Sequence, residues 1–436
     1  MNRDKTQICS PLTLTTTGFK LNGSVLGKDG ANHAMDKLGP LLRAIQELRH
    51  LHTHDGLFLL RHHLLPKVSY LMRTLVCPGQ TWKVLEDAIV DYVCHKVLSV
   101  DPGAAIMTPR LFLPIKQGGL GLMKPSCIAP EAYKASREQC LSLSKKFFSL
   151  DPFRLAEDYH PISHPSSGPH TPFSNADPPD IFAILSQRDM DIINGLTPLD
   201  KIPSQRTRTA TQHAKLEDSL AQQQDVATRQ RTAALYSQFS VQWSKLPMTA
   251  NVPVVTDEQV NAALLEHLLA TGLTCQTCKR HPVDATHLAC CSESQVTTTK
   301  RHDDVVKTIG DHLRSNGFTV LYEPHTRRPG SNLRADLCFH SPNHSSKTID
   351  VCITNTKSTT LKECLDKAHK RKANKHKMET YEGPFTPITI HRCGTLHEAS
   401  QKLLKTLPNS NELLHHLSMI LLKHRGQTVL KSRRGF

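Results

Sequence analysis

Aromatic residues and long apolar runs are scarce in this chain, and each absence excludes a class of protein. Phe, Trp and Tyr make up 5% of the 436 residues, which argues against base-stacking platforms of the OB-fold or RRM kind. No apolar stretch reaches the roughly eighteen residues that a membrane-spanning helix needs. The 13 cysteines are not preceded by an N-terminal apolar segment, so they indicate a reducing compartment rather than a disulfide framework. No motif for a small-molecule substrate stands out.

Positive charge, in contrast, is abundant. The formal net charge is +15, which favours an anionic partner, most commonly nucleic acid. Residues 367–377 (KAHKRKANKHK) carry six Lys or Arg and two His on one expected helix. This segment can present a catalytic lysine, contact phosphates or act as a nuclear localisation signal. A solvated basic surface is the alternative.

Two aspartates stand in neighbouring segments that have the composition of β-strands. Asp336 lies in the run 333–339 (LRADLCF), and Asp350 follows it after thirteen residues in the run 347–353 (KTIDVCI). Carboxylates on adjacent strands can converge on one Mg²⁺ or Mn²⁺ ion, which prefers oxygen ligands. Such an ion supports metal-assisted phosphodiester hydrolysis. The alternative is two ordinary surface aspartates.

The segments around this pair predict an α-β-β-β-α-β order. Val305, Ile309 and Leu313 recur at helical spacing, and Gly317 ends that helix. A strand is expected at 318–323, before the two aspartate strands. A polar helix over about 359–380, a strand at 386–391 and helices through Leu407 and Leu422 complete the prediction.

This order and its acidic residues resemble the PD-(D/E)xK nuclease core, in which Glu323, Asp336 and Asp350 match the acidic positions. Cys352 stands where that family has its lysine. The segment is more similar to the restriction-like endonuclease of non-LTR retrotransposons, in which the lysine comes from the following helix. The resemblance therefore implies Lys375 or Lys377 as the catalytic lysine and Tyr381 as a further site residue. On an ideal helix Ala373, Lys377 and Tyr381 share one face, which favours Lys377.

Four possible zinc ligands precede this segment. Cys275 and Cys278 form a CxxC pair, and His287 and Cys291 follow at the spacing of a closed structural zinc site. Cys290 is the alternative fourth ligand, and free thiols in a reducing compartment are the alternative interpretation. In the retrotransposon family a knuckle of this kind lies just before the endonuclease and helps to grip nucleic acid.

The first third of the chain also resembles non-LTR reverse transcriptases, in the region after the polymerase palm. Residues 18–27 (GFKLNGSVLG), 65–73 (LPKVSYLMR) and 113–122 (LPIKQGGLGL) carry this resemblance. Three helical patterns are expected, at about 38–51, 56–75 and 81–100. No Tyr-x-Asp-Asp or Phe-x-Asp-Asp occurs, so fingers and palm are expected to precede residue 1, and polymerase activity is not expected of this chain alone.

The resemblance thus implies a multidomain protein: a mainly α-helical reverse-transcriptase thumb-like region (1–150), a linker with bridging helices (151–260), a CCHC zinc knuckle (261–299) and an α/β PD-(D/E)xK restriction-endonuclease-like domain (300–436). The expected function is Mg²⁺- or Mn²⁺-dependent nicking of target DNA in the nucleus, with DNA and element RNA as partners and Zn²⁺ in the knuckle. The expected nucleic-acid contacts are Arg301, His302, Lys370, Arg371 and Lys372. The alternatives are a catalytically dead nucleic-acid-binding remnant and a thumb module that acts beside a separate palm.

Overall fold

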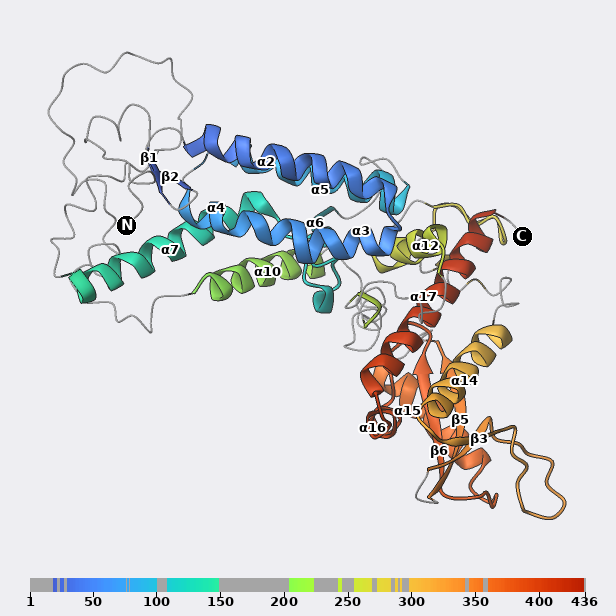
Figure 1. The fold of residues 1–436 in the computed structure, drawn as a ribbon. Helices are drawn as coiled ribbons and strands as arrows, with labels where there is room; N and C mark the ends of the chain where they lie inside the picture. Colours follow the sequence, from blue (N-terminus) through green and yellow to red (C-terminus); the bar gives the residue numbers. More distant parts are fainter. Residues whose placement is uncertain are drawn as a thin grey trace, which may run out of the picture. The chain divides into compact units, whose positions relative to one another are not determined.

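The computed structural model describes residues 19–21, 24–26, 30–75, 77, 79–99, 108–148, 204–222, 242–244, 255–268, 273–283, 287–288, 291, 298–341, 345–355 and 360–434. In this part of the chain the structure is mostly helical, with a two-stranded hairpin and one four-stranded mixed sheet (Figure 1). The fold class therefore agrees with the prediction at this coarse level. Of the predicted linker 151–260, residues 151–203, 223–241 and 245–254 lie outside the described residues, as does Cys290.

The chain divides into two compact units whose segments alternate along the sequence. The first comprises Met1–Leu48, Leu60–Ile89 and Met123–Leu216, and the second comprises Arg49–Leu59, Val90–Leu122 and Glu217–Phe436. The knuckle segment and the α/β region thus belong to one compact unit, together with part of the N-terminal third. The domain boundaries proposed from the sequence remain predictions.

Most of the described residues of the first unit are helical. Leu38, Leu41 and Ile45 are buried on one side of helix α2 (Gly30–Glu47), as the apolar stripe predicts. The other long helices that contribute to this unit are α5 (Gly79–Asp91), α7 (Pro125–Phe148) and α10 (Gln205–Gln222). Arg208 of α10 donates to the buried carboxylate of Glu138 on α7 at 2.6 Å. The segment 18–27 contributes strands β1 (Phe19–Leu21) and β2 (Ser24–Leu26), which pair antiparallel.

The single helix predicted over 56–75 is interrupted. It divides into α3 (Thr53–Leu59), a π-helical segment (Leu60–Leu64), a 3₁₀ segment (Leu65–Val68) and α4 (Ser69–Thr74). Pro66 lies in the first turn of the 3₁₀ segment. Proline has no N–H to donate and its ring crowds the preceding turn, which disfavours a regular α-helix at this position.

The Gly-rich decapeptide 113–122 forms a tight turn in the second unit. Gly118 and Gly121 have φ angles of 92° and 66°, in the left-handed region that favours glycine. At Gly119 a Cβ atom would lie 2.0 Å from the carbonyl oxygen of Leu113, so no larger residue fits. The carbonyl oxygen of Gly119 lies 3.1 Å from Nε2 of the buried His267. The glycines are therefore required by the local backbone.

The four-stranded sheet follows the predicted order. Its strands are β3 (Thr319–Tyr322), β4 (Leu337–His340), β5 (Ser346–Thr354) and β6 (Phe385–His391). Neighbours in the order β3-β4-β5-β6 pair antiparallel, antiparallel and parallel. The parallel pair is connected through α15 (Leu361–Lys375), while α14 (Thr298–Ser315), α16 (Glu398–Lys405) and α17 (Ser410–Arg434) complete the region.

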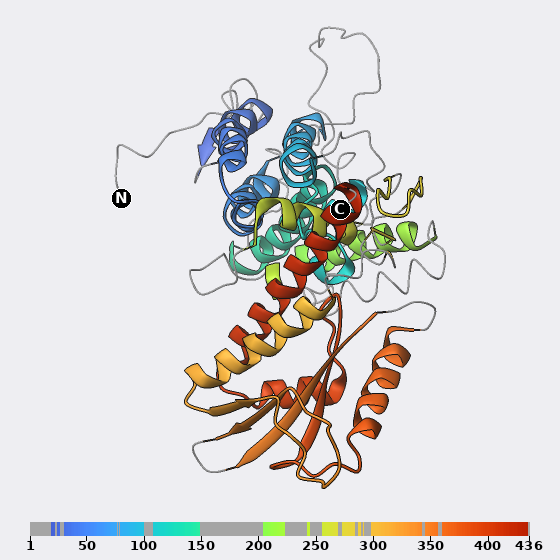
Figure 2. The same cartoon turned by 90° about the vertical axis from the view of Figure 1, so that its right-hand side faces the viewer.

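The two faces of this sheet have different roles. Ile349, Val351, Ile388 and Ile390 pack into an apolar core with side chains of α14, α16 and α17. Helix α15 lies on the opposite side of the sheet from α14 and α17 (Figure 2). Because side chains alternate along a strand, Asp350 points away from the apolar core and towards the α15 face. A buried core on one face therefore fixes the direction of the carboxylate on the other.

Helix α12 (Asp257–His267) crosses α17 closely in the second unit (Figure 1). The carboxylate of Glu266 is buried between Arg392, which follows β6, and Arg425 of α17, whose Nε donates at 2.9 Å. Beside this cluster the two backbones approach at Gly426, where a Cβ atom would lie 2.0 Å from the carbonyl oxygen of Gln259. Charge compensation and close backbone packing thus hold α12 and α17 together.

Because the backbone of Gln259 lies so close to Gly426, we expect a single added methyl group there to lower the stability of the fold considerably. Gly426→Ala should destabilise the chain by about 1–3 kcal/mol or more, because the added carbon meets backbone rather than a movable side chain. Chemical denaturation followed by circular dichroism measures the change. Gly79→Ala is the matched control, since nothing lies within 4 Å of a Cβ atom there. Equal stability of the two variants would contradict the close approach of α12 and α17.

His267 predicts a pH-dependent contribution to stability. Burial lowers its pKa from 6.5 to about 3, so the folded chain binds this proton less tightly than the unfolded chain. The contribution of neutral His267 to the free energy of unfolding is complete above pH 6.5 and is lost as pH falls from 6.5 towards 3. The stability advantage of wild type over His267→Gln should therefore shrink by about 1.4 kcal/mol per pH unit below pH 6.5.

Denaturation of both proteins above and below pH 6.5 measures this difference. The comparison cancels the other titrating groups, some of which act in the opposite direction. A difference that does not change with pH would show that His267 is not the group responsible.

Candidate active site and metal centre

Asp336 and Asp350 meet on the α15 face of the sheet. Asp336 immediately precedes β4 and accepts a hydrogen bond from the backbone N–H of Val351 at 2.5 Å. This bond brings its carboxylate beside that of Asp350 on β5, and the two side chains interact directly. The expectation that they share one face is therefore confirmed in geometry.

The electrostatics of the pair favour one bound proton near neutral pH. Burial and, after it, the neighbouring Asp336 carboxylate raise the pKa of Asp350 to about 7, against the opposing effect of Lys372. Burial also acts to raise the pKa of Asp336, but hydrogen bonds, first of all from His302, lower it overall. Asp336 is thus the ionised member, and a cation between the two groups would relieve their repulsion.

Two side chains of α15 reach Asp350. Lys372 Nζ lies 2.7 Å from Asp350 Oδ2, and His376 Nε2 lies 2.9 Å from the same oxygen atom. Neither contact has hydrogen-bond angles, so the positive charge of Lys372 lies beside this buried oxygen without an aligned donor. The other ring nitrogen of His376 lies 2.7 Å from the Tyr381 hydroxyl. When that hydroxyl donates, the hydrogen of the neutral ring is on Nε2, facing Asp350.

His302 contacts the other aspartate. Its Nε2 atom lies 3.2 Å from Asp336 Oδ2 and 3.3 Å from the carbonyl oxygen of Val351. The hydrogen bond to Asp336 raises the pKa of His302 to about 9, despite partial burial. The ring is therefore a cation at neutral pH and lies at the edge of the carboxylate pair.

The structure separates Lys377 from the pair. Helix α15 ends at Lys375, not near residue 380, and His376 is its C-cap. Lys377 follows in a turn and is exposed, and among the described residues it forms no ion pair with either aspartate. Lys375 is likewise exposed. The geometric argument for Lys377 is therefore wrong: it assumed a helix that continues through residue 381, whereas Lys372 is the lysine that reaches Asp350.

The remaining predicted residues lie at different distances from the pair. Tyr381 is buried and joins the site through His376, and burial raises its pKa to about 12. Glu323 is exposed and pairs with Arg334 at 2.9 Å, so its carboxylate is directed to the surface and not to the aspartates. Lys370 and Arg371 are exposed, and Arg301 is partly buried in the first turns of α14.

Sequence reasoning missed His376 and gave Lys372 only a nucleic-acid contact. A signal for both was present in the helix. Leu365 and Ala368 are the buried apolar positions of α15, and steps of four from Ala368 lead to Lys372 and then to His376. The face of the helix that packs on the sheet therefore continues into the two groups beside Asp350.

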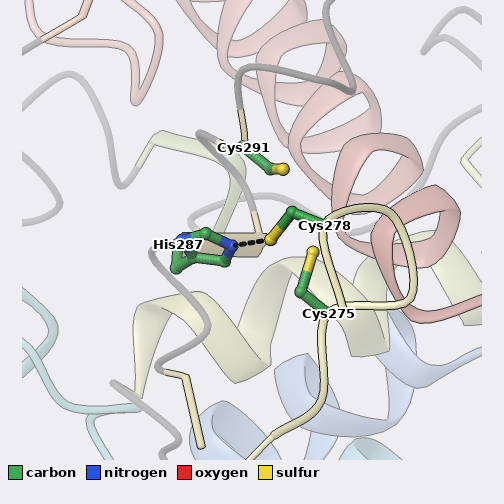
Figure 3. Close-up of side chains that lie close together, drawn as sticks. All are labelled: Cys275, Cys278, His287 and Cys291. Carbon is green, nitrogen blue, oxygen red and sulfur yellow. Dashed lines mark hydrogen bonds between the residues drawn. The ribbon is translucent and has the colours of Figure 1, made fainter. Parts of the chain in front are cut away.

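The predicted knuckle residues form a second cluster. One ligand atom from each of Cys275, Cys278, His287 and Cys291 lies within 4.8 Å of the others, so the four can hold a metal ion (Figure 3). Cys278 Sγ is 3.2 Å from His287 Nε2. Hydrogen bonds and nearby groups lower the pKa of Cys275 to about 6, although burial opposes them. A thiolate and a set of three sulfur atoms with one nitrogen suit zinc.

The knuckle is anchored to the two crossing helices. Cys275, Cys291 and Leu288 pack with Ala262 of α12 and Val429 of α17 in a small apolar core. The N–H of Gln276 donates to the carbonyl oxygen of Ser432 at 2.7 Å, and the Ser432 hydroxyl donates to the carbonyl oxygen of Leu288 at 2.8 Å. Helix α17 thus contacts both halves of the ligand set.

No protein-family model matches the chain, and no curated protein matches its sequence. Among the helices that the structure describes, none is both long and apolar enough to cross a membrane.

The cluster predicts one tightly bound zinc ion that stabilises the second unit. Cys278→Ala should lose this ion and lower the melting temperature, because metal binding to a folded site adds its free energy to folding. Elemental analysis and thermal melting measure the two effects. Cys127→Ala, at an exposed cysteine outside the cluster, should retain both metal and stability. Retention of the tightly bound ion by Cys278→Ala would contradict this ligand set.

Proposed function

We propose that this chain is a metal-dependent DNA endonuclease that nicks target DNA and derives from a non-LTR retrotransposon polyprotein. The observation that carries the proposal is the cluster of Asp336, Asp350 and Lys372 on one sheet face. Two carboxylates with an adjacent lysine are the groups that metal-assisted phosphodiester hydrolysis requires.

The order of elements supports this assignment. Helix α14, strands β3 to β5, helix α15 and strand β6 succeed one another as in a PD-(D/E)xK core, and β5 pairs parallel to β6. The N-terminal segments 65–73 and 113–122 support the thumb-like origin through their sequence. The positive charge of residues 367–377 is compatible with a nuclear protein that contacts DNA and element RNA.

The residues of the pair fit Mg²⁺ or Mn²⁺. Both ions prefer oxygen ligands, and Asp336 and Asp350 present carboxylate oxygens on one face. Asp350 Oδ2 is buried without an aligned hydrogen-bond donor, and burial together with the neighbouring Asp336 carboxylate raises the pKa of this carboxyl. A bound cation would stabilise its ionised form. The bound ion would supply Lewis-acid activation of water and of the scissile phosphate.

The chain's own side chains supply the remaining electrostatics. Lys372 is partly exposed beside Asp350, so its ammonium group is available to stabilise negative charge on a phosphate. The His302 cation at the other end of the pair offers a second positive group. His376 and Tyr381 stack with Phe385 and thereby orient the ring that faces Asp350. Lys372 and His302 thus place positive charge on either side of a buried and a half-buried carboxylate.

The surface of α15 supports binding of DNA near this site. Lys367, Lys370, Arg371 and Lys375 are exposed along the helix, whereas Leu365, Ala368 and Lys372 face the sheet. Exposed Lys and Arg on one helix give salt-dependent contacts to phosphates. The knuckle, which belongs to the same compact unit, adds a second basic element through Lys279 and Arg280.

A catalytically dead, nucleic-acid-binding remnant is the second candidate. It is favoured by two features: Cys352 stands at the usual lysine position, and Glu323 pairs with Arg334 away from the pair. In that case Lys372 would serve only to compensate the buried Asp350. Binding without cleavage would distinguish this candidate.

Replacement of single lysines tests the proposal. Lys372→Ala should reduce nicking of supercoiled plasmid in Mg²⁺ or Mn²⁺ by about 100-fold or more, because a charge-stabilising group beside the reacting phosphate is lost. Lys377→Ala is the matched control, since this exposed lysine lies beyond the helix, and it should cut normally. Both variants should bind DNA nearly as well as wild type, because each removes one contact among many.

Asp336→Asn and Asp350→Asn serve as inactive references in the same assay. Normal cutting by Lys372→Ala together with a loss in Lys377→Ala would refute the assignment of the lysine. If the wild-type chain binds DNA but does not cut it with Mg²⁺ or Mn²⁺, the nuclease proposal is wrong and the catalytically dead, nucleic-acid-binding remnant is supported.

A further inference from the structure

A third cluster of metal-binding groups lies outside both sites described above. One ligand atom from each of Cys338, His340 and Glu382 lies within 4.8 Å of the others. Cys338 Sγ is 3.9 Å from His340 Nε2, which in turn is 4.0 Å from Glu382 Oε2. The three side chains offer a sulfur, a nitrogen and an oxygen atom to one point.

The strand and the loop that carry these residues are fixed by independent contacts. Cys338 and His340 are two residues apart on β4 and therefore point to the same face of the sheet. Glu382 is held by its backbone, since its carbonyl oxygen accepts a hydrogen bond from the Thr348 hydroxyl at 2.9 Å. Next to it, Gly383 has a φ angle of 83°, and a Cβ atom there would lie 2.2 Å from the carbonyl oxygen of Ser346. The loop can approach the strands this closely only with glycine.

The imidazole of His340 is oriented for binding. Its Nδ1 atom lies 2.8 Å from the Ser346 hydroxyl, which leaves Nε2 directed towards Cys338 and Glu382. A second partner on the other ring nitrogen is the usual arrangement for metal-ligating histidines, because it fixes both tautomer and ring orientation. Ser346 thus has the position of such a partner.

We propose that Cys338, His340 and Glu382 bind a divalent transition-metal ion of the zinc class, with solvent as the fourth ligand. A thiolate and an imidazole select zinc or a similar borderline ion over Mg²⁺ or Ca²⁺. Zinc bonds of about 2.0–2.3 Å in tetrahedral geometry separate ligand atoms by roughly 3.3–3.8 Å. The 3.9 and 4.0 Å separations of His340 Nε2 from Cys338 Sγ and Glu382 Oε2 must therefore shorten by roughly 0.3–0.7 Å when an ion binds. The site is independent of the proposed nuclease function.

The burial of the ligands indicates an open site. Cys338 is 1% exposed, whereas the side chain of Glu382 is 44% exposed, so the remaining coordination position faces solvent. Arg327 lies 3.3 Å from Glu382 Oε2 and competes for this carboxylate. Because both members of that ion pair are exposed, the pair contributes little and yields readily to a metal ion. Three protein ligands and one solvent position distinguish this site from the closed knuckle.

Cobalt absorption provides the test. The full chain is first loaded with one equivalent of Zn²⁺, which occupies the knuckle, and then titrated with Co²⁺. A thiolate-to-cobalt charge-transfer band should grow and saturate at one further equivalent. Cobalt held by Asp336 and Asp350 gives no such band, because those ligands contain no sulfur.

Three variants assign the band. It should disappear in Cys338→Ala, and Glu382→Gln should weaken Co²⁺ binding at least about ten-fold. Cys364→Ala is the matched control, because this buried thiol on α15 contacts Thr354 and Asn355 instead of the triad, and it should keep the band. Loss of the charge-transfer band in Cys364→Ala would mean that Cys364, and not Cys338, binds the ion.

Two results would overturn the site: no band beyond the knuckle in wild type, or an undiminished band in Cys338→Ala. If Cys338→Ala does not fold, Glu382→Gln decides, since its side chain is largely at the surface. Unchanged Co²⁺ affinity in that variant would also overturn the assignment.

Discussion

The buried carboxylate of Glu266 is the interaction on which the second unit depends. It compensates two arginines that are themselves almost fully buried, Arg392 after the last strand and Arg425 on α17. A charge in such surroundings is tolerated only while its partners remain, so removal of any member leaves an uncompensated ion in the interior. Arg392 also donates to Asn355 at the end of β5 at 2.9 Å. One carboxylate therefore links α12, α17 and both parallel strands.

The aspartate pair follows from a division of the sheet into an apolar face and a polar face. Burial of Ile349 and Val351 against α14 and α17 leaves Asp350 no direction except towards α15. On that face the acids are enclosed deeply enough for their charges to interact strongly, and Lys372, His376 and His302 surround them. The same polar face carries Cys338 and His340 further along β4. The alternation of side chains along the strands thus places Asp350, Cys338 and His340 on the same face of the sheet.

Much of the α/β region was predictable because its signals are local. Helix α14 has a regular apolar stripe, and the four strands are short runs of apolar or β-branched residues. Their positions therefore agree with the sequence to within a few residues. The knuckle ligands were predictable from their spacing, and the structure brings all four together. The lysine beside Asp350 was not predictable: Lys372 lies there instead of the expected Lys377. Which lysine reaches the aspartate depends on where α15 ends and on which face of this helix packs on the sheet. A capping box of Thr360 and Glu363 starts the helix, but tertiary packing determines its phase and its end. The sequence also contains no local pattern that predicts how segments of the two compact units alternate along the chain.

Helix α17 connects two parts of the second unit, helix α14 and the knuckle. His424 lies 2.8 Å from Asp304 in the first half of α14, the helix that also carries His302, and Ser432, eight residues later, bonds to the knuckle. Eight residues of α-helix correspond to about 12 Å of rigid rod. The knuckle and the helix that carries His302 are therefore both anchored to α17, and a shift of either along α17 would break its anchoring contact. The separation of the two anchor points is therefore set by the number of helical residues between them and not by a hinge.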